Sequence, residues 1–240
     1  MTIKSSFAFV INKENSGESD RLYTFYTEEF GKIRLLAVGS QKIKAKLSGH
    51  LEIPSYVWIK FSLGRKNKLI SALEIEPFLK LKENFWGLFV SFEILKFLDQ
   101  FTLEGENDKK VWILLSQAFF YLKENIGKGW DKDLVHFLFL YFLAQFLKIS
   151  GWAPYLKNCL ICNEKANYFS FQQRGLVCRS HKDNDSIFLT PKEKESLRSL
   201  FEKNFEEFNG TILKEILQFQ KKFLLIFQKF TFSLKLAIMD

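Results

Sequence analysis

Apolar and polar residues alternate over most of the first 80 residues of this chain. Successive side chains of a strand point to opposite faces, so each alternating stretch predicts a half-buried β-strand. The stretches are residues 7–11, 22–26, 33–37, 57–61 and 69–75, and glycine-rich or polar breaks separate them. Five short strands with such turns favour a small closed barrel over residues 1–80, with the five-stranded OB-fold as the leading candidate. An SH3-like barrel fits the same pattern nearly as well.

The spacing of the apolar residues becomes helical after Pro77. Three helices that are too apolar to stand alone are predicted over residues 85–101, 111–122 and 134–149. The chain is therefore expected to be an α+β protein, with an N-terminal OB-fold barrel followed by an all-helical domain. This domain is expected in two parts, residues 81–150 and 186–240.

Helix-start signals mark the second helical part. Thr190 is a suitable N-cap, Pro191 fits the first turn, and Glu193 completes the spacing of a capping box. One long helix is predicted after it, over residues 211–237.

A small module with metal-ligand spacing lies between the two helical parts, over residues 151–185. Cys159 and Cys162 form one close pair, and Cys178 and His181 form a second after fifteen intervening residues. Two such pairs suit one tetrahedral Zn²⁺ ion, and four protein ligands leave no open position, so the expected zinc is structural. A redox pair at Cys159 and Cys162, or unrelated buried thiols, are the alternatives.

Positive charge is concentrated in the predicted barrel. The chain carries a formal net charge of +8, and basic residues outnumber acidic ones by 13 to 8 over residues 1–80. The loops of an OB-fold flank its nucleic-acid groove, so cations there are placed for phosphate contact. The candidate DNA-binding residues are Lys32, Arg34, Lys42, Lys44, Lys46, Arg65, Lys66 and Lys68.

Aromatic residues of the same strands offer faces on which unpaired bases can stack. The candidates are Tyr23, Phe25, Tyr26, Tyr56 and Trp58. The competing interpretation is that most of these side chains fill the barrel and that the lysines are solvated.

The sequence gives little support to catalysis. A nuclease or phosphotransferase needs clustered carboxylates for Mg²⁺ or a glycine loop that cradles phosphate, and neither is evident. We therefore expect a protein that is not an enzyme. No segment resembles a signal peptide or is long enough to cross a bilayer, and the metal spacing of the cysteines favours a reducing compartment, so a cytoplasmic location is expected.

Several separated segments resemble the RecO family of bacterial DNA recombination and repair proteins. Residues 17–32 read GESDRLYTFYTEEFGK and are similar to the opening motif of that family, and LEIP at residues 51–54 follows at a similar distance. GWAPYLKNC at residues 151–159 and RGLVC at residues 174–178 are similar to the segments around the family's metal module.

The resemblance implies an N-terminal OB-fold, a helical C-terminal domain and a zinc module. It also implies a recombination mediator without catalytic activity that binds single- and double-stranded DNA, anneals complementary strands and pairs with RecR. Such a mediator helps to load RecA onto DNA coated by single-stranded DNA-binding protein, and is expected at the nucleoid. The rival class is a zinc-ribbon nucleic-acid-binding factor in transcription or RNA metabolism, which shares the zinc and the charge but not the motif at residues 17–32.

The same resemblance implies a binding site for the acidic C-terminal tail of the single-stranded DNA-binding protein, which ends in Phe. An apolar groove edged by lysines would suit it. The candidate residues are Phe219, Phe223, Phe227, Lys221, Lys222 and Lys229. Two departures from the family pattern stand out. VGSQK at residues 38–42 replaces a more basic segment, and His181 stands where cysteine is common.

Overall fold

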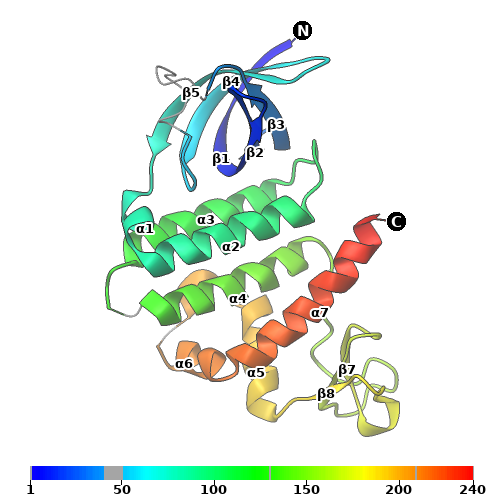
Figure 1. Cartoon of the computed structure of the whole chain (residues 1–240). Coiled ribbons are helices and arrows are strands. Elements are labelled where there is room, and N and C mark those ends of the chain that lie inside the picture. The colour runs from blue at the N-terminus through cyan, green and yellow to red at the C-terminus, as the bar shows by residue number, and fades with distance from the viewer. Residues whose placement is uncertain (1, 41–50, 130, 209, 240) are drawn as a thin grey trace. The chain divides into compact units, whose positions relative to one another are not determined.

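A computed structural model describes residues 2–40, 51–129, 131–208 and 210–239 (Figure 1). The chain divides into two compact units, residues 1–135 and 136–240, and the division falls inside helix α4 (Asp131–Ile149). Each unit is described by itself. The boundaries expected from the sequence, at residues 80, 150 and 185, stay a prediction.

Five strands of the first unit close into a barrel. They are β1 (Thr2–Ser16), β2 (Asp20–Thr27), β3 (Gly31–Ala37), β4 (Tyr56–Leu63) and β5 (Lys68–Glu76). Their order is β1-β2-β3-β5-β4, and β4 pairs with β1 to complete the circle. All pairs are antiparallel except the single parallel contact of β3 with β5. This closed strand order is that of an OB-fold, which settles the choice that the alternating pattern left open.

The inward-facing side chains of these strands form the barrel core. Tyr23 and Phe25 are fully buried members of it, together with Leu35 and Phe61. Tyr26 is also buried, on the outward side of β2. The hypothesis that Tyr23, Phe25 and Tyr26 stack against bases is therefore wrong, because all three are enclosed by the protein's own side chains.

Three helices of the first unit follow the barrel: α1 (Leu79–Glu83), α2 (Phe85–Phe101) and α3 (Lys109–Asn125). An aromatic cluster joins α3 and the start of α1 to β1. The ring of Phe9 lies 5.4 Å from that of Trp112 and 5.3 Å from that of Phe119, both on α3, and 6.2 Å from that of Phe78. Figure 1 shows that one end of the barrel lies against α2 and α3. The helix predicted over residues 85–101 is confirmed.

The segment between α2 and α3 seals the free edge of β3. Gly105 donates its N–H to the carbonyl of Lys32 at 2.8 Å, and Glu104 bridges to Lys32 in a parallel sense. Gly31 adopts φ +61°, and a Cβ added there would overlap the backbone oxygen of Glu106. β3 needs this cover because its only pairing with β5 is at Leu36.

The second unit holds the rest of α4, a three-stranded sheet and helices. The sheet has the order β7-β6-β8, with β6 (Tyr168–Ser170), β7 (Gly175–Val177) and β8 (Ile187–Phe188). Helices α5 (Pro191–Glu202), α6 (Gly210–Gln218) and α7 (Gln220–Met239) follow. Short 3₁₀ turns occur at η2 (Arg179–His181) and η3 (Phe205–Glu207).

Two expectations about these helices have different outcomes. The capping box of α5 is confirmed, since Thr190 and Glu193 each accept the other's backbone N–H. The prediction of a single helix over residues 211–237 is wrong, because the helix is interrupted by a turn at Phe219. The carbonyl of Phe219 accepts from Lys222 and Phe223, so a new helix begins there.

Replacing Gly31 by alanine tests the sealed edge. We expect Gly31→Ala to lower the free energy of unfolding by at least about 2 kcal/mol more than Gly17→Ala, measured by urea denaturation. Both glycines have positive φ, so both variants carry the backbone strain of about 1–2 kcal/mol. Only Gly31 faces the backbone of Glu106, whereas nothing lies within 4 Å of a Cβ at Gly17. Equal losses would mean that the segment does not hold this edge.

Candidate metal centre and nucleic-acid interface

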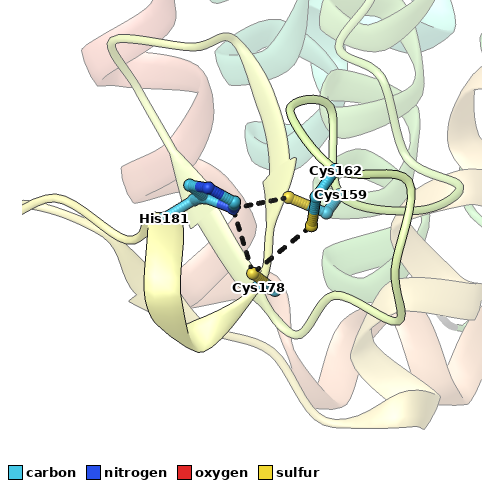
Figure 2. A group of neighbouring side chains, drawn as sticks. All are labelled: Cys159, Cys162, Cys178 and His181. Carbon is cyan, nitrogen blue, oxygen red and sulfur yellow. Dashed lines mark hydrogen bonds between the residues drawn. The ribbon is translucent and has the colours of Figure 1, made fainter.

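A tight turn presents the first two metal-ligand candidates. Cys159 accepts the N–H of Asn163 at 2.9 Å and donates its own N–H to Glu164 at 2.7 Å. Asn163 has φ 61°, a left-handed conformation that asparagine tolerates better than most residues. This turn brings Cys162 back beside Cys159, as Figure 2 shows.

The end of β7 presents the other two candidates. Cys178 follows the strand directly, and the 3₁₀ turn η2 carries His181 back toward it, with the His181 N–H 3.2 Å from the Cys178 carbonyl. The two turns are held together, because Leu160 donates its N–H to Leu176 at 2.9 Å. The fold therefore makes the two pairs converge.

The four ligand atoms have the spacing of a tetrahedral metal site. All lie within 4.8 Å of one another. The sulfurs of Cys162 and Cys178 are 3.8 Å apart, and the Cys159 sulfur is 3.6 Å from His181 Nδ1. With Zn–S bonds of about 2.3 Å and Zn–N bonds of about 2.0 Å, a tetrahedron requires about 3.8 Å between the two sulfurs and about 3.5 Å between sulfur and nitrogen. The Cys178 sulfur lies somewhat closer to Nδ1, at 3.2 Å.

The electrostatics favour the thiolate, the form that binds metal, at Cys159 and Cys178. At Cys162 the backbone N–H of Glu164 lowers the pKa, but burial and the side chains of Cys159 and Cys178 outweigh it and raise the pKa above its ordinary value. Burial raises the pKa of Cys159, but hydrogen bonds from backbone N–H groups, including that of Cys162, lower it more, to about 6. Burial likewise raises the pKa of Cys178, and the N–H groups of Ser180 and His181 reverse that shift and leave it below its ordinary value. Side-chain hydrogen bonds to Cys159 and Cys178 raise the pKa of His181.

Neighbouring residues fix the module in place. A Cβ at Gly175 would lie 2.8 Å from the carbonyl oxygen of Tyr155, so this close approach needs glycine. Arg174 stacks 4.0 Å above the ring of Trp152. On α5, Lys194 donates to the Ala166 carbonyl at 2.8 Å. The module is thus built into the second unit.

The convergence of four ligands distinguishes a metal site from a redox pair. All three cysteines are free, and each lies next to a ligand from the other turn. The cluster of Cys159, Cys162, Cys178 and His181 can therefore hold a metal ion, as the spacing predicts.

The predicted DNA-binding residues have different environments. Arg34, Arg65, Lys66 and Lys68 are exposed. Among the residues that the structure describes, none of these four takes part in an ion pair. Lys42, Lys44 and Lys46 lie outside the described residues.

The prediction that Lys32 binds DNA is wrong. Lys32 is only 6% exposed, and its ammonium group donates to the backbone oxygen of Asp99 at 2.6 Å and lies 3.4 Å from Asp99 Oδ1. A buried, paired ammonium group is not placed to contact phosphate. Lys32 instead attaches the end of α2 to the barrel.

The cover over Lys32 also closes part of the face that OB-folds commonly use, which is the outer side of β2 and β3. Thr24 and Tyr26 are the outward residues of β2 here and are 2% and 1% exposed. Burial strongly raises the pKa of Tyr26, and Asp108 raises it further. The covering segment, residues 99–108, has four carboxylates and no basic residue, so it also repels a polyanion.

The sequence suggested an apolar groove on the final helix for an acidic tail peptide. Its two central residues, Phe223 and Phe227, do not line a groove. Phe223 and Phe227 are buried, with 0% and 1% exposed, and pack in the core of the second unit. The ammonium group of Lys222 forms an ion pair with Glu193, with Nζ and Oε1 2.7 Å apart.

A hollow elsewhere in the same unit has no counterpart among the features predicted from the sequence. It has a volume of about 210 Å³, and its lining includes Lys148, Pro154, Leu156, Lys157 and Arg198. These residues come from three separate segments, so no local pattern could have indicated them.

The fold and the site define an OB-fold protein whose second unit carries a four-ligand metal module. The family model for the Recombination protein O N terminal matches residues 1–78, and that for the Recombination protein O C terminal matches residues 90–225. The chain therefore belongs to the RecO family.

Curated proteins named DNA repair protein RecO are similar over most of the chain. The protein of Dehalococcoides mccartyi is 27% identical over 176 residues, covering 71% of this chain and 67% of the relative. The protein of Thermodesulfovibrio yellowstonii is 28% identical over 179 residues, 73% of this chain and 68% of its own. That of Bacillus mycoides is 26% identical over 180 residues, 73% and 69%. Among the described helices, none has the length and apolar character needed to cross a bilayer.

Exchanging His181 tests the metal centre. We expect His181→Ala to lose most of its metal, because three ligands remain, whereas His181→Cys should keep it as a four-cysteine site. Elemental analysis of protein purified without added metal measures both. If His181→Ala retains a full equivalent, or if the parent protein holds none while its module is folded, the assignment fails.

Proposed function

We propose that this protein is a non-enzymatic recombination mediator in DNA repair, which binds single- and double-stranded DNA through its barrel. The observation that supports it most is the closed OB-fold with a cationic β4–β5 turn, in a chain of the RecO family. Arg65 and Lys66 lie in that turn, and Lys68 opens β5. Loops at this position flank the nucleic-acid groove of OB-folds.

The metal of the proposed function is one structural zinc ion held by Cys159, Cys162, Cys178 and His181. Three sulfur ligands and one imidazole nitrogen favour Zn²⁺ over hard cations such as Mg²⁺. When bound, the ion cross-links two turns of a module whose strands are only two or three residues long. It supplies stability rather than chemistry, since the protein fills all four positions.

The mediator role further includes annealing of complementary strands, pairing with RecR and loading of RecA onto coated DNA at the nucleoid in the cytoplasm. Family membership supports these steps. Strand annealing needs no bond chemistry, which agrees with the lack of evident catalytic motifs in the sequence.

The proposed site for the tail of the single-stranded DNA-binding protein is the hollow whose lining includes Lys148, Pro154, Leu156, Lys157 and Arg198, with Glu202 as its single carboxylate. Apolar side chains can take the terminal Phe, and the cations suit the acidic residues before it. Lys148 and Arg198 donate to backbone carbonyls of Phe201 and Leu156, both at 2.7 Å, which fixes their positions.

Charge reversal in the β4–β5 turn tests the DNA-binding proposal. We expect Arg65→Glu, Lys66→Glu and Lys68→Glu together to weaken binding to all DNA sequences alike and to slow strand annealing without Mg²⁺ or nucleotide. The slope of log affinity against log salt should shrink by about three, since each lost phosphate contact removes about 0.9.

The matched control reverses three exposed lysines of the helices, Lys96, Lys109 and Lys110, and so changes net charge equally. Fluorescence anisotropy with labelled oligonucleotides measures both variants. Equal losses would indicate a general charge effect and contradict a site at the turn. Cleavage of DNA by the pure protein would overturn the non-enzymatic assignment.

The tail site is tested with a synthetic tail peptide and calorimetry. We expect Lys157→Glu to weaken binding about tenfold, because the variant replaces attraction by repulsion at the edge of the hollow. Binding should weaken with salt and vanish when the terminal Phe of the peptide is removed. Lys192→Glu, at an exposed position of α5, is the control. If Lys157→Glu and Lys192→Glu bind equally well, the tail lies elsewhere.

A further inference from the structure

An apolar row crosses the outer face of the barrel on three neighbouring strands. Phe7 of β1 lies opposite Trp58 of β4, and Trp58 lies opposite Leu73 of β5. The inward positions on either side of Trp58 belong to Val57 and Ile59, which are core residues, so Trp58 faces outward.

These side chains are unusually accessible for large apolar groups. Phe7 is 38% exposed and Leu73 is 58% exposed, while Trp58 is half-buried. Phe7 also stacks on Tyr56, with centroids 5.6 Å apart and an interplanar angle of 11°, so its ring is held in place. The held ring of Phe7 beside the ring of Trp58 offers a platform for a flat partner.

Cations border the row on one side. Lys60 follows Trp58 by two residues, on the same face of β4. Lys4 of β1 lies opposite the core residue Phe61, so its side chain starts from the other face, and its ammonium group lies 5.9 Å from the centre of the Phe30 ring. Both lysines line a hollow of about 400 Å³ whose lining is Ile3, Lys4, Ser5, Glu29, Trp58 and Lys60. Glu29 is the single carboxylate of this set. Beyond Lys60, β4 leads directly to the turn with Arg65 and Lys66, so positive charge continues from the hollow to the turn.

The usual nucleic-acid face of the fold is partly closed in this protein, although Arg34 on β3 stays exposed. Thr24, Tyr26 and Lys32 are buried there, under the acidic segment of residues 99–108. The outer face of β1, β4 and β5 is covered by α3 near Phe9 and Tyr56, but it is open around Phe7 and Trp58, where Lys60 lies beside accessible aromatic rings. That is the combination that binds single strands, in which bases stack on rings while cations follow the backbone.

We propose that the outer face of β1, β4 and β5 binds the unpaired bases of single-stranded nucleic acid, with Phe7 and Trp58 as stacking residues and Lys60 as a phosphate contact. The inference rests on the proposed function, since it assumes that the barrel binds DNA. It specifies which face of the barrel binds DNA and predicts that this face prefers single strands to duplexes. Bases of a duplex are already stacked on one another, so Phe7 and Trp58 can stack only on the bases of single strands. The basic β4–β5 turn can contact the phosphates of both forms.

The test replaces the aromatic rings of Trp58 and Phe7 and leaves all charged residues unchanged. Trp58→Leu and Phe7→Leu keep an apolar side chain and remove the stacking surface, while Trp58→Phe restores a ring. We expect Trp58→Leu and Phe7→Leu each to weaken binding of a single-stranded oligonucleotide about tenfold, a loss in the range of one stacked base. Trp58→Phe should recover most of that loss, and duplex affinity should stay within about twofold of the parent.

The matched control is Phe85→Leu, which alters a ring that is 72% exposed on α2 of the same unit. Thermal unfolding verifies that each variant is folded. If Trp58→Leu leaves single-strand affinity unchanged while the charge reversal at the turn abolishes binding, this inference is overturned and the proposed function stands. If neither change weakens binding, both fail.

A second measurement does not depend on variants. An oligonucleotide with 5-iodouracil, irradiated in complex with the parent protein, should cross-link to peptides that contain Phe7 or Trp58. Cross-links confined to β2 and β3 would place the bases on the other face and overturn the proposal. Loss of RecR binding in Trp58→Leu with unchanged single-strand affinity would also overturn it, because the row would then be a protein interface.

Discussion

The contact of Lys32 with Asp99 determines how the barrel can be used. Lys32 is 6% exposed, and its charge is balanced by a carboxylate and a backbone oxygen from the end of α2. Removing one partner of such a pair typically costs about 3–5 kcal/mol, because the other charge stays buried. The segment between α2 and α3 continues from Asp99 along the open edge of β3, where Gly105 bonds to Lys32. The barrel and its first helices therefore behave as one folded unit.

That arrangement has a functional consequence. The segment that completes the barrel carries only negative charge, and it lies over the face where many OB-folds take nucleic acid. Exposed cations and rings occur instead on the β4–β5 hairpin and on the strands beside it. The metal module belongs to the second unit and has a separate role, since a closed four-ligand site stabilises a small loop-rich structure that has little core of its own.

Local patterns in the sequence predicted local features well. The ligand spacing indicated the Cys159 and His181 cluster because both turns are formed by neighbouring residues. Alternation indicated the strands, but it could not choose between barrel types, since strand order depends on pairing between distant segments. The burial of Lys32 was missed for the same reason, because Asp99 is 67 residues away. The break at Phe219 was missed because its neighbours on both sides keep helical spacing, and the apolar pattern continues across it.

Hydroxyl-radical footprinting with mass spectrometry tests the central claim most directly, namely that DNA meets the barrel on its open face and not on the covered one. In the free protein, Phe7 and Trp58 should be oxidised readily, whereas the buried Tyr23 and Tyr26 should not. Adding a single-stranded oligonucleotide should protect Phe7 and Trp58 and leave residues 99–108 unchanged. If DNA leaves both rings reactive and instead changes the reactivity of Tyr26 and its covering segment, the account is contradicted.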